Sequence, residues 1–205
     1  MCSSDLPRFT YHGFQYVVLT GLAEPPQLGA VTGLVLHSDT PLASRFECSD
    51  EVMNRLFRNI VWTQRANYLE VPTDCPQRDE RLGWMGDAQI YAGAATRNAD
   101  VASFFTKWLD DVEEAQRDFG AYPDYCPYPM THGTPRKSFG TAWMDAGIVC
   151  PWTIWQAYGD TRVIERHWAS MTRFMDFRAA TTTPEGLGVS IGNPWGDWLN
   201  LNETT

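Results

Sequence analysis

One short segment, residues 71–89, concentrates the side chains that could do chemistry. It holds carboxylates, arginines and an indole, held between prolines and glycines: Asp74, Asp79, Glu80, Asp87, Arg78, Arg81, Trp84, Pro72, Pro76, Gly83 and Gly86. The prolines and glycines favour a turn over a helix. A solvated loop with local ion pairs would have a similar charge content, but it needs no indole. A sugar site needs all of these groups, because carboxylates and guanidinium groups hydrogen-bond hydroxyls, an indole stacks on the apolar face of a sugar, and a protonated carboxyl can donate to a leaving oxygen.

The composition argues against some classes of binding partner. The formal net charge is −9, which argues against nucleic acid and acidic membranes, since phosphate binding needs a basic face. The sequence has no run of about 18 apolar residues, so it predicts no membrane span. The first residues lack the basic patch and apolar stretch of a signal peptide. The 5 cysteines are widely spread, with no CxxC pair and no His/Cys cluster. The sequence therefore predicts no zinc site, no cofactor and no disulfide framework.

The elements that must position this segment are mainly helical. Two short runs rich in aromatic and β-branched residues, 9–19 and 30–37, predict strands. Helical periodicity then predicts five helices, at residues 49–70, 86–98, 100–112, 141–158 and 160–180, with Ser49 as the first N-cap. The joins between these helices alternate between short and long. That alternation favours helical hairpins whose long loops, 70–85, 120–140 and 181–205, gather at one end of the scaffold, where sites usually lie.

The segment PTDCPQRDERLGWMGDAQ resembles the signature loop of the bacterial α-L-rhamnosidases of glycoside hydrolase family 78. Three further stretches, PRFTYHGFQYVVLTGL, AWMDAGIVCPWTIWQAYGD and NPWGDWLN, are similar to other parts of that family, in the same order. The resemblance implies a mainly α fold: part of an (α/α)6 six-hairpin barrel, preceded by the last strands of a β-sandwich. It divides the chain into residues 7–45, the end of the sandwich and a linker, and residues 46–205, the N-terminal part of the barrel. Residues 1–6 resemble a translated adapter sequence.

The resemblance also implies roles for particular residues. Glu80, in the DER triplet, corresponds to the general acid. Further residues correspond to groups that contact the sugar or form aromatic walls around it: Asp74, Arg78, Trp84, Asp87, Trp143 and Trp198. For Trp143 and Trp198 the alternative is a place in the barrel core. The remaining tryptophans are predicted to be core residues: Trp62, Trp108, Trp152, Trp155 and Trp168.

The implied reaction is hydrolysis of terminal α-L-rhamnosyl bonds with inversion, so the partners are rhamnose-containing glycosides. An inverting enzyme needs a second carboxylate, and neither Glu185 nor Glu203 lies in the family's base motif. We therefore expect a fragment that lacks its general base, has little activity alone, and exposes apolar faces around Phe104, Phe105 and Trp108. Two alternatives stay open: a sugar-binding polypeptide without catalysis, and another (α/α)6-barrel glycosidase related to glucoamylases or trehalases. The sequence leaves the compartment, cytoplasmic or exported, and the oligomeric state undetermined.

Overall fold

The computed structural model describes residues 11–128, 139–189 and 195, and in this part of the chain it is helical. Five α-helices follow one another along the chain: α1 (Glu51–Asn67), α2 (Met85–Asn98), α3 (Ala102–Glu114), α4 (Ala146–Tyr158) and α5 (Arg162–Thr181). A two-residue strand pair, β1 (Tyr68–Leu69) and β2 (Val71–Pro72), follows α1, and a 3-10 turn, η1 (Leu28–Ala30), precedes it. The predicted mainly α fold is confirmed. None of these described helices is long and apolar enough to cross a membrane.

Polar side chains and glycine fix several helix ends close to the predicted positions. The start of α4 is an exception: residues 141–145 form a turn, so the helix begins at Ala146, five residues later than predicted. α1 begins one residue later than expected, because the carboxylate of Asp50, and not Ser49, accepts a hydrogen bond from the Val52 N–H at 2.8 Å. Asp160 serves α5 in the same way, accepting from the Arg162 N–H at 3.0 Å. α4 ends at Gly159, whose φ of 68° is the left-handed conformation that glycine adopts most readily at a helix C-terminus.

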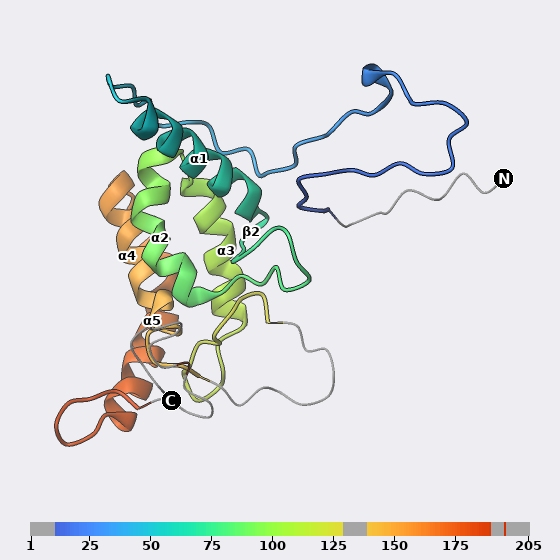
Figure 1. Cartoon of the computed structure of the whole chain (residues 1–205). Coiled ribbons are helices and arrows are strands. Elements are labelled where there is room, and N and C mark those ends of the chain that lie inside the picture. The colour runs from blue at the N-terminus through green and yellow to red at the C-terminus, as the bar shows by residue number, and fades with distance from the viewer. Residues whose placement is uncertain (1–10, 129–138, 190–194, 196–205) are drawn as a thin grey trace.

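The helices α2 to α5 run alternately up and down (Figure 1). α4 packs against α2, α3 and α5, and α3 also packs against α5. The turns at 99–101 and 159–161 lie at one end of these helices, and the loops 73–84, 115–128 and 182–189 lie at the other. Backbone hydrogen bonds tie two of these loops together: the Met85 N–H donates to the Asp124 carbonyl at 2.9 Å, and the Cys126 N–H donates to the Gly83 carbonyl at 2.8 Å. The expected gathering of the long loops at one end is confirmed for their described residues.

The core lies between α2, α3, α4 and α5. Small residues of α2, Ala88, Ala92 and Ala95, let the neighbouring helix approach closely. Phe104, Phe105 and Trp108 on α3 are at most 7 % exposed, so the expectation that this face would be open is wrong. The face is covered because Tyr68 of β1, which follows α1, stacks on Phe104 with 4.5 Å between ring centroids.

Three of the five tryptophans predicted as core are instead exposed. Trp62, Trp152 and Trp168 have relative exposures between 50 % and 62 %, whereas Trp108 is fully buried and Trp155 is half-buried. Each of the three lies on the outer side of its helix. Tryptophan is usually buried, but the burial of a particular ring depends on whether another element packs against that face of its helix.

The two predicted strands at 9–19 and 30–37 do not form in their described residues. From residue 11 to residue 36 the chain is almost entirely exposed and runs away from the helices as a wide loop (Figure 1). A strand needs a hydrogen-bonded neighbour, and these residues have none within the described chain. Tyr11, at its start, lies under the Arg81 guanidinium at 5.0 Å. Beyond residue 36 the chain returns to the helices, where the Ser38 N–H donates to the Tyr68 carbonyl and Leu42 forms a single bridge with Ala99.

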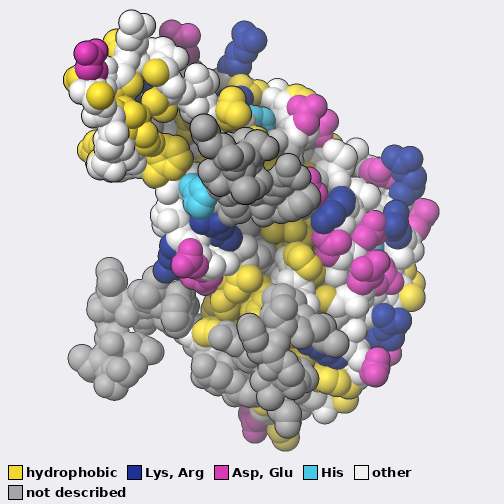
Figure 2. Space-filling view, turned by 90° about the vertical axis from the view of Figure 1, so that its right-hand side faces the viewer, with side chains coloured by type: hydrophobic (Ala, Val, Ile, Leu, Met, Phe, Trp, Pro, Cys, Tyr) yellow, Lys and Arg dark blue, Asp and Glu magenta, His cyan; other side chains and the backbone are white. Residues whose placement is uncertain are grey.

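Charge is mixed over the helical surface. Figure 2 shows Lys and Arg side chains interspersed with Asp and Glu on the face in view, with no broad area of one sign. The helices also carry partly exposed ion pairs, such as Lys107 with Asp111 at 2.6 Å and Arg166 with Asp110 at 2.8 Å. Exposed pairs of this kind contribute little to stability, so burial of the aromatic core is the main stabilising contribution.

Candidate active site

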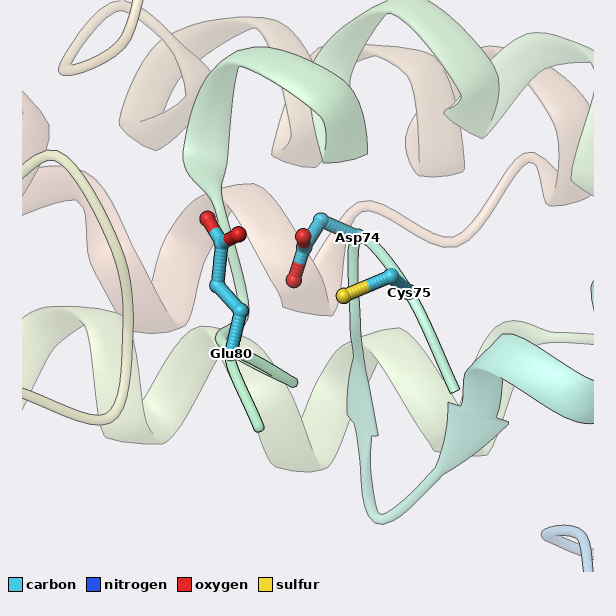
Figure 3. Close-up of side chains that lie close together, drawn as sticks. All are labelled: Asp74, Cys75 and Glu80. Carbon is cyan, nitrogen blue, oxygen red and sulfur yellow. The ribbon is translucent and has the colours of Figure 1, made fainter. Parts of the chain in front are cut away.

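The loop between β2 and α2 is closed on itself by Asp74. The Asp74 N–H donates to the Leu82 carbonyl at 3.0 Å, and the Leu82 N–H donates back to the Asp74 carboxylate at 3.0 Å. This reciprocal pair brings the two ends of the loop together across eight residues. As a result the side chains of Asp74, Cys75 and Glu80 point toward one another (Figure 3), with their ligating atoms within 4.8 Å.

Glu80 is held on both carboxylate oxygens. The indole N–H of Trp84 donates to Oε1 at 2.7 Å, and the Arg78 guanidinium lies 2.5 Å from Oε2. The Glu80 side chain is 31 % exposed, so one part of it still faces solvent. Two neighbours therefore fix the orientation of the Glu80 carboxylate, and part of it stays open to solvent.

Arg78 supplies the positive charge among these groups. Its guanidinium contacts all three members of the cluster: Glu80 at 2.5 Å, Asp74 at 3.5 Å and the Cys75 sulfur at 3.2 Å. Asp74, Cys75 and Glu80 are also the described residues whose spacing could hold a metal ion. The arginine offsets the charge of one of the two carboxylates, so the cluster of Asp74, Cys75, Glu80 and Arg78 stays negative when both carboxylates are ionised.

A cleft of about 600 Å³ adjoins this loop. Asp74, Asp87 and Trp143 line it, together with residues of α1 and α2 and with β2. Glu80 and Trp84 do not line the cleft. The structure therefore brings the predicted residues together as two adjoining groups that share Asp74, instead of the single concavity that was expected.

Asp87 and Trp143 are placed by the first turn of α2. Gly86 packs against the Trp143 indole so closely that a Cβ atom there would lie 2.9 Å from Nε1. The pKa of the Asp87 carboxyl is raised above its ordinary value, chiefly because the carboxyl is partly withdrawn from water, and the negative charges of Asp74 and Glu80 add to this effect. Trp143 is half-buried and lines the cleft, so it lies where an aromatic wall was predicted.

Trp198, the other predicted aromatic wall, lies outside the described residues. A different residue of the same NPWGDWLN stretch, Trp195, reaches the loop cluster. Its ring meets the Trp84 ring edge-on, with 5.1 Å between centroids and an interplanar angle of 89°. Its indole N–H donates to the carboxylate of Asp124 at 2.8 Å.

The sequence did not single out Asp124 or Trp195. For Trp195 a signal existed, because the residue lies within a stretch that resembles the family. For Asp124 there was none, since a lone Asp in a Pro/Tyr-rich loop has no distinguishing pattern.

Comparison with known proteins shows the family of this chain. Residues 41–205 match the model of the bacterial α-L-rhamnosidase six-hairpin glycosidase domain. An α-L-rhamnosidase of Streptomyces avermitilis is 42 % identical over 97 % of this chain and 19 % of its own length. One from Formosa agariphila is 37 % identical over 95 % of this chain and 20 % of its own length. The chain thus spans about a fifth of the length of these relatives.

Solved structures show the same likeness. The α-L-rhamnosidase from Dictyoglumus thermophilum superposes with a TM-score of 0.76 at 40 % identity, over 85 % of this chain and 19 % of that protein. The Streptomyces avermitilis α-L-rhamnosidase complexed with L-rhamnose gives a TM-score of 0.71 at 37 % identity, over 82 % of this chain and 16 % of that protein. The predicted resemblance is confirmed: this chain belongs to the bacterial α-L-rhamnosidase six-hairpin glycosidase family.

Proposed function

We propose that this chain is part of a glycoside hydrolase that cleaves terminal α-L-rhamnosyl bonds with inversion, and that Glu80 is its general acid. The observation that carries the proposal is the Glu80 carboxyl, oriented by the Trp84 N–H at 2.7 Å and directed toward Asp74. Family membership supports the reaction class, and the relative complexed with L-rhamnose supports the type of sugar.

In this proposal the neighbouring residues hold the sugar. Asp74 and Asp87 lie on the cleft wall and accept hydrogen bonds from sugar hydroxyls. Arg78 leaves the carboxylates on substrate binding and donates to the sugar, since its side chain is 63 % exposed and free to move. Trp143 stacks against an apolar face of the ring. Trp198 is proposed to form a second wall, as the resemblance implies.

The general base is proposed to be none of the described carboxylates next to Glu80. An inverting glycosidase keeps its acid and base roughly 6.5–9.5 Å apart, so that a water molecule fits between base and sugar. Asp74 lies within 4.8 Å of Glu80, and its carboxylate already accepts the Leu82 N–H. Asp79 is exposed on the outside of the loop. A carboxylate from another part of the enzyme therefore has to activate the water.

The test is hydrolysis of two α-L-rhamnosides by the complete gene product that contains this sequence. A methyl rhamnoside has a basic alkoxide leaving group, which needs a proton, whereas a 4-nitrophenyl rhamnoside has a leaving group that departs without one. Glu80→Gln is expected to lower kcat/KM for the methyl glycoside by about 10²–10⁴-fold and for the nitrophenyl glycoside by much less.

Asp79→Asn is the matched control, because it removes an adjacent, exposed carboxylate of the same loop. It is expected to leave both rates within about twofold of the wild type, as for most surface substitutions. Equal losses on the two substrates for Glu80→Gln would contradict the assignment of the acid. Binding of L-rhamnose without hydrolysis of either substrate by the wild type would instead favour a sugar-binding protein.

A further inference from the structure

Asp124 is a buried carboxylate that joins three separate segments. It lies in the loop after α3 and is 2 % exposed. Its Oδ1 accepts the Gly140 N–H at 2.6 Å, and its Oδ2 accepts the Trp195 indole N–H at 2.8 Å. Its backbone carbonyl accepts the Met85 N–H at the start of α2, at 2.9 Å. One residue therefore holds the start of α2, Gly140 and Trp195 together.

From Asp124 a short series of contacts leads to the proposed acid. Trp195, held by Asp124, meets Trp84 edge-on at 5.1 Å between ring centroids. Trp84 in turn donates its indole N–H to Glu80 at 2.7 Å. We propose that Asp124 is a positioning residue: it holds Trp195 against Trp84 and thereby keeps the Glu80 carboxyl aimed at the glycosidic oxygen. This inference rests on the proposed function, because it assumes that Glu80 donates the proton.

The chemistry of the position requires a carboxylate. Burying a charged group is costly unless it is well hydrogen-bonded, so a residue with a purely space-filling role would be apolar. Here two N–H donors, from the Gly140 backbone and the Trp195 indole, approach the two oxygens of one side chain. An asparagine in the same place offers one acceptor oxygen, and its NH₂ group would face a second donor. One of the two segments would then lose its hydrogen bond.

Gly140 shows how tightly this arrangement is packed. A Cβ atom at residue 140 would lie 2.9 Å from Cδ1 of Trp195 and 3.2 Å from Oδ1 of Asp124. Only glycine lets the backbone N–H approach the carboxylate while the indole lies beside it. The three residues Asp124, Gly140 and Trp195 therefore form one unit behind Trp84.

The first test compares Asp124→Asn with Asp118→Asn in the complete gene product. Asp118 is an exposed residue of the same loop, and its substitution should change neither rate. Asp124→Asn should lower kcat/KM for a methyl α-L-rhamnoside by about 10–100-fold, as for a misplaced catalytic group. The loss for a 4-nitrophenyl α-L-rhamnoside should be at least severalfold smaller. A purely structural role would reduce both rates by the same factor, because it would lower only the amount of folded enzyme.

Trp195→Phe keeps the aromatic ring and removes the N–H that Asp124 accepts. It should show the same dependence on the leaving group, and the double variant Asp124→Asn with Trp195→Phe should be no worse than the poorer single variant. Additive losses in the double variant would overturn the inference. Equal losses on the two substrates in Asp124→Asn would do the same.

A second measurement does not depend on activity. After incorporation of 5-fluorotryptophan, the ¹⁹F resonance of Trp84, assigned with Trp84→Phe, should shift in Asp124→Asn and stay in place in Asp118→Asn. An unchanged Trp84 resonance in Asp124→Asn would refute the positioning role even if no rhamnoside is hydrolysed. Absence of hydrolysis by the wild type, together with a shifted resonance, would instead refute the proposed reaction and keep the structural link.

Discussion

The indole N–H of Trp84 lies 2.7 Å from Oε1 of Glu80, four residues earlier in the chain. Trp84 comes directly before α2, so the position of the carboxyl is tied to the start of a well-packed helix. Glu80, although it lies in a loop, is therefore held by a residue next to a packed helix. The start of α2 leads to two predictions, on Trp84 and on Gly86. The raised pKa of Asp87 leads to a third, and the absence of a suitably spaced base near Glu80 leads to a fourth.

Replacing Trp84 by Phe keeps a ring beside Trp195 and removes the donor to Glu80. A hydrogen bond between uncharged groups contributes about 0.5–1.5 kcal/mol, so kcat for a methyl α-L-rhamnoside should fall by about 2- to 10-fold in steady-state assays. Trp152→Phe, at an exposed ring on α4, serves as the control and should have the wild-type kcat. An unaltered kcat in Trp84→Phe would mean that this hydrogen bond does not orient the acid.

Replacing Gly86 by Ala should push the Trp143 indole out of its place at the cleft, because the added Cβ would lie 2.9 Å from Nε1. We expect KM for α-L-rhamnosides to rise by about 3- to 10-fold, the loss of one aromatic contact. The same substitution at Gly93, on the same helix, meets nothing within 4 Å. Gly93→Ala should therefore leave KM unchanged and raise the melting temperature, since alanine in a helix is about 1 kcal/mol more favourable than glycine. If both variants showed equal KM values, Trp143 would have no part in binding.

Asp87→Asn should stabilise the fold at neutral pH while weakening binding of the sugar. The pKa of Asp87 is raised in the folded state, so its charged form is less favourable there than in the unfolded chain. The destabilisation is fully present above the folded-state pKa and is lost as the pH falls to the unfolded value of about 3.9. Thermal unfolding should thus give a higher melting temperature for Asp87→Asn at pH 7, and the difference should vanish near that lower pH. A constant difference across this range would contradict the assigned pKa direction.

Residues 1–205 expressed alone should hydrolyse a chromogenic α-L-rhamnoside no faster than their own Glu80→Gln variant. The reason is the proposed absence of a suitably spaced base among the described carboxylates near Glu80. The measurement is initial rate at equal concentrations of folded protein, checked by circular dichroism. Turnover well above that of Glu80→Gln would identify a base within the chain, with Asp87 and Glu185 as the first to substitute.

The sequence was sufficient wherever the determining interactions are local. The helix boundaries at Asp50 and Gly159 follow from capping chemistry within a few residues, and periodicity located the helices between them. The predicted site residues from Asp74 to Trp84 share one loop and Asp87 follows in the first turn of α2, so a single pattern contained them. The error of one residue at the start of α1 is of the size expected for helix ends.

The sequence was insufficient where the partner is distant. The Asp124 carboxylate accepts a hydrogen bond from Trp195, 71 residues away, and no sequence pattern near Asp124 predicts that contact. Trp62, Trp152 and Trp168 were assigned to the core because tryptophan is usually buried, but burial depends on which helix lies opposite. The predicted strands at 9–19 and 30–37 needed hydrogen-bonded neighbours that the described chain does not offer.

The contacts that join Asp124 to Gly140 and Trp195 span 16 and 71 residues, whereas α2 and α3, or α4 and α5, are linked by turns of a few residues. Closing a long loop costs more entropy than closing a short one, so we expect the α4–α5 pair to form before the aromatic cluster around Trp84. The reverse order applies on warming, because segments held by a few contacts open before the packed core does. Backbone amide exchange should therefore be faster at Gly140 than within α3, and activity should be lost at a lower temperature than helicity.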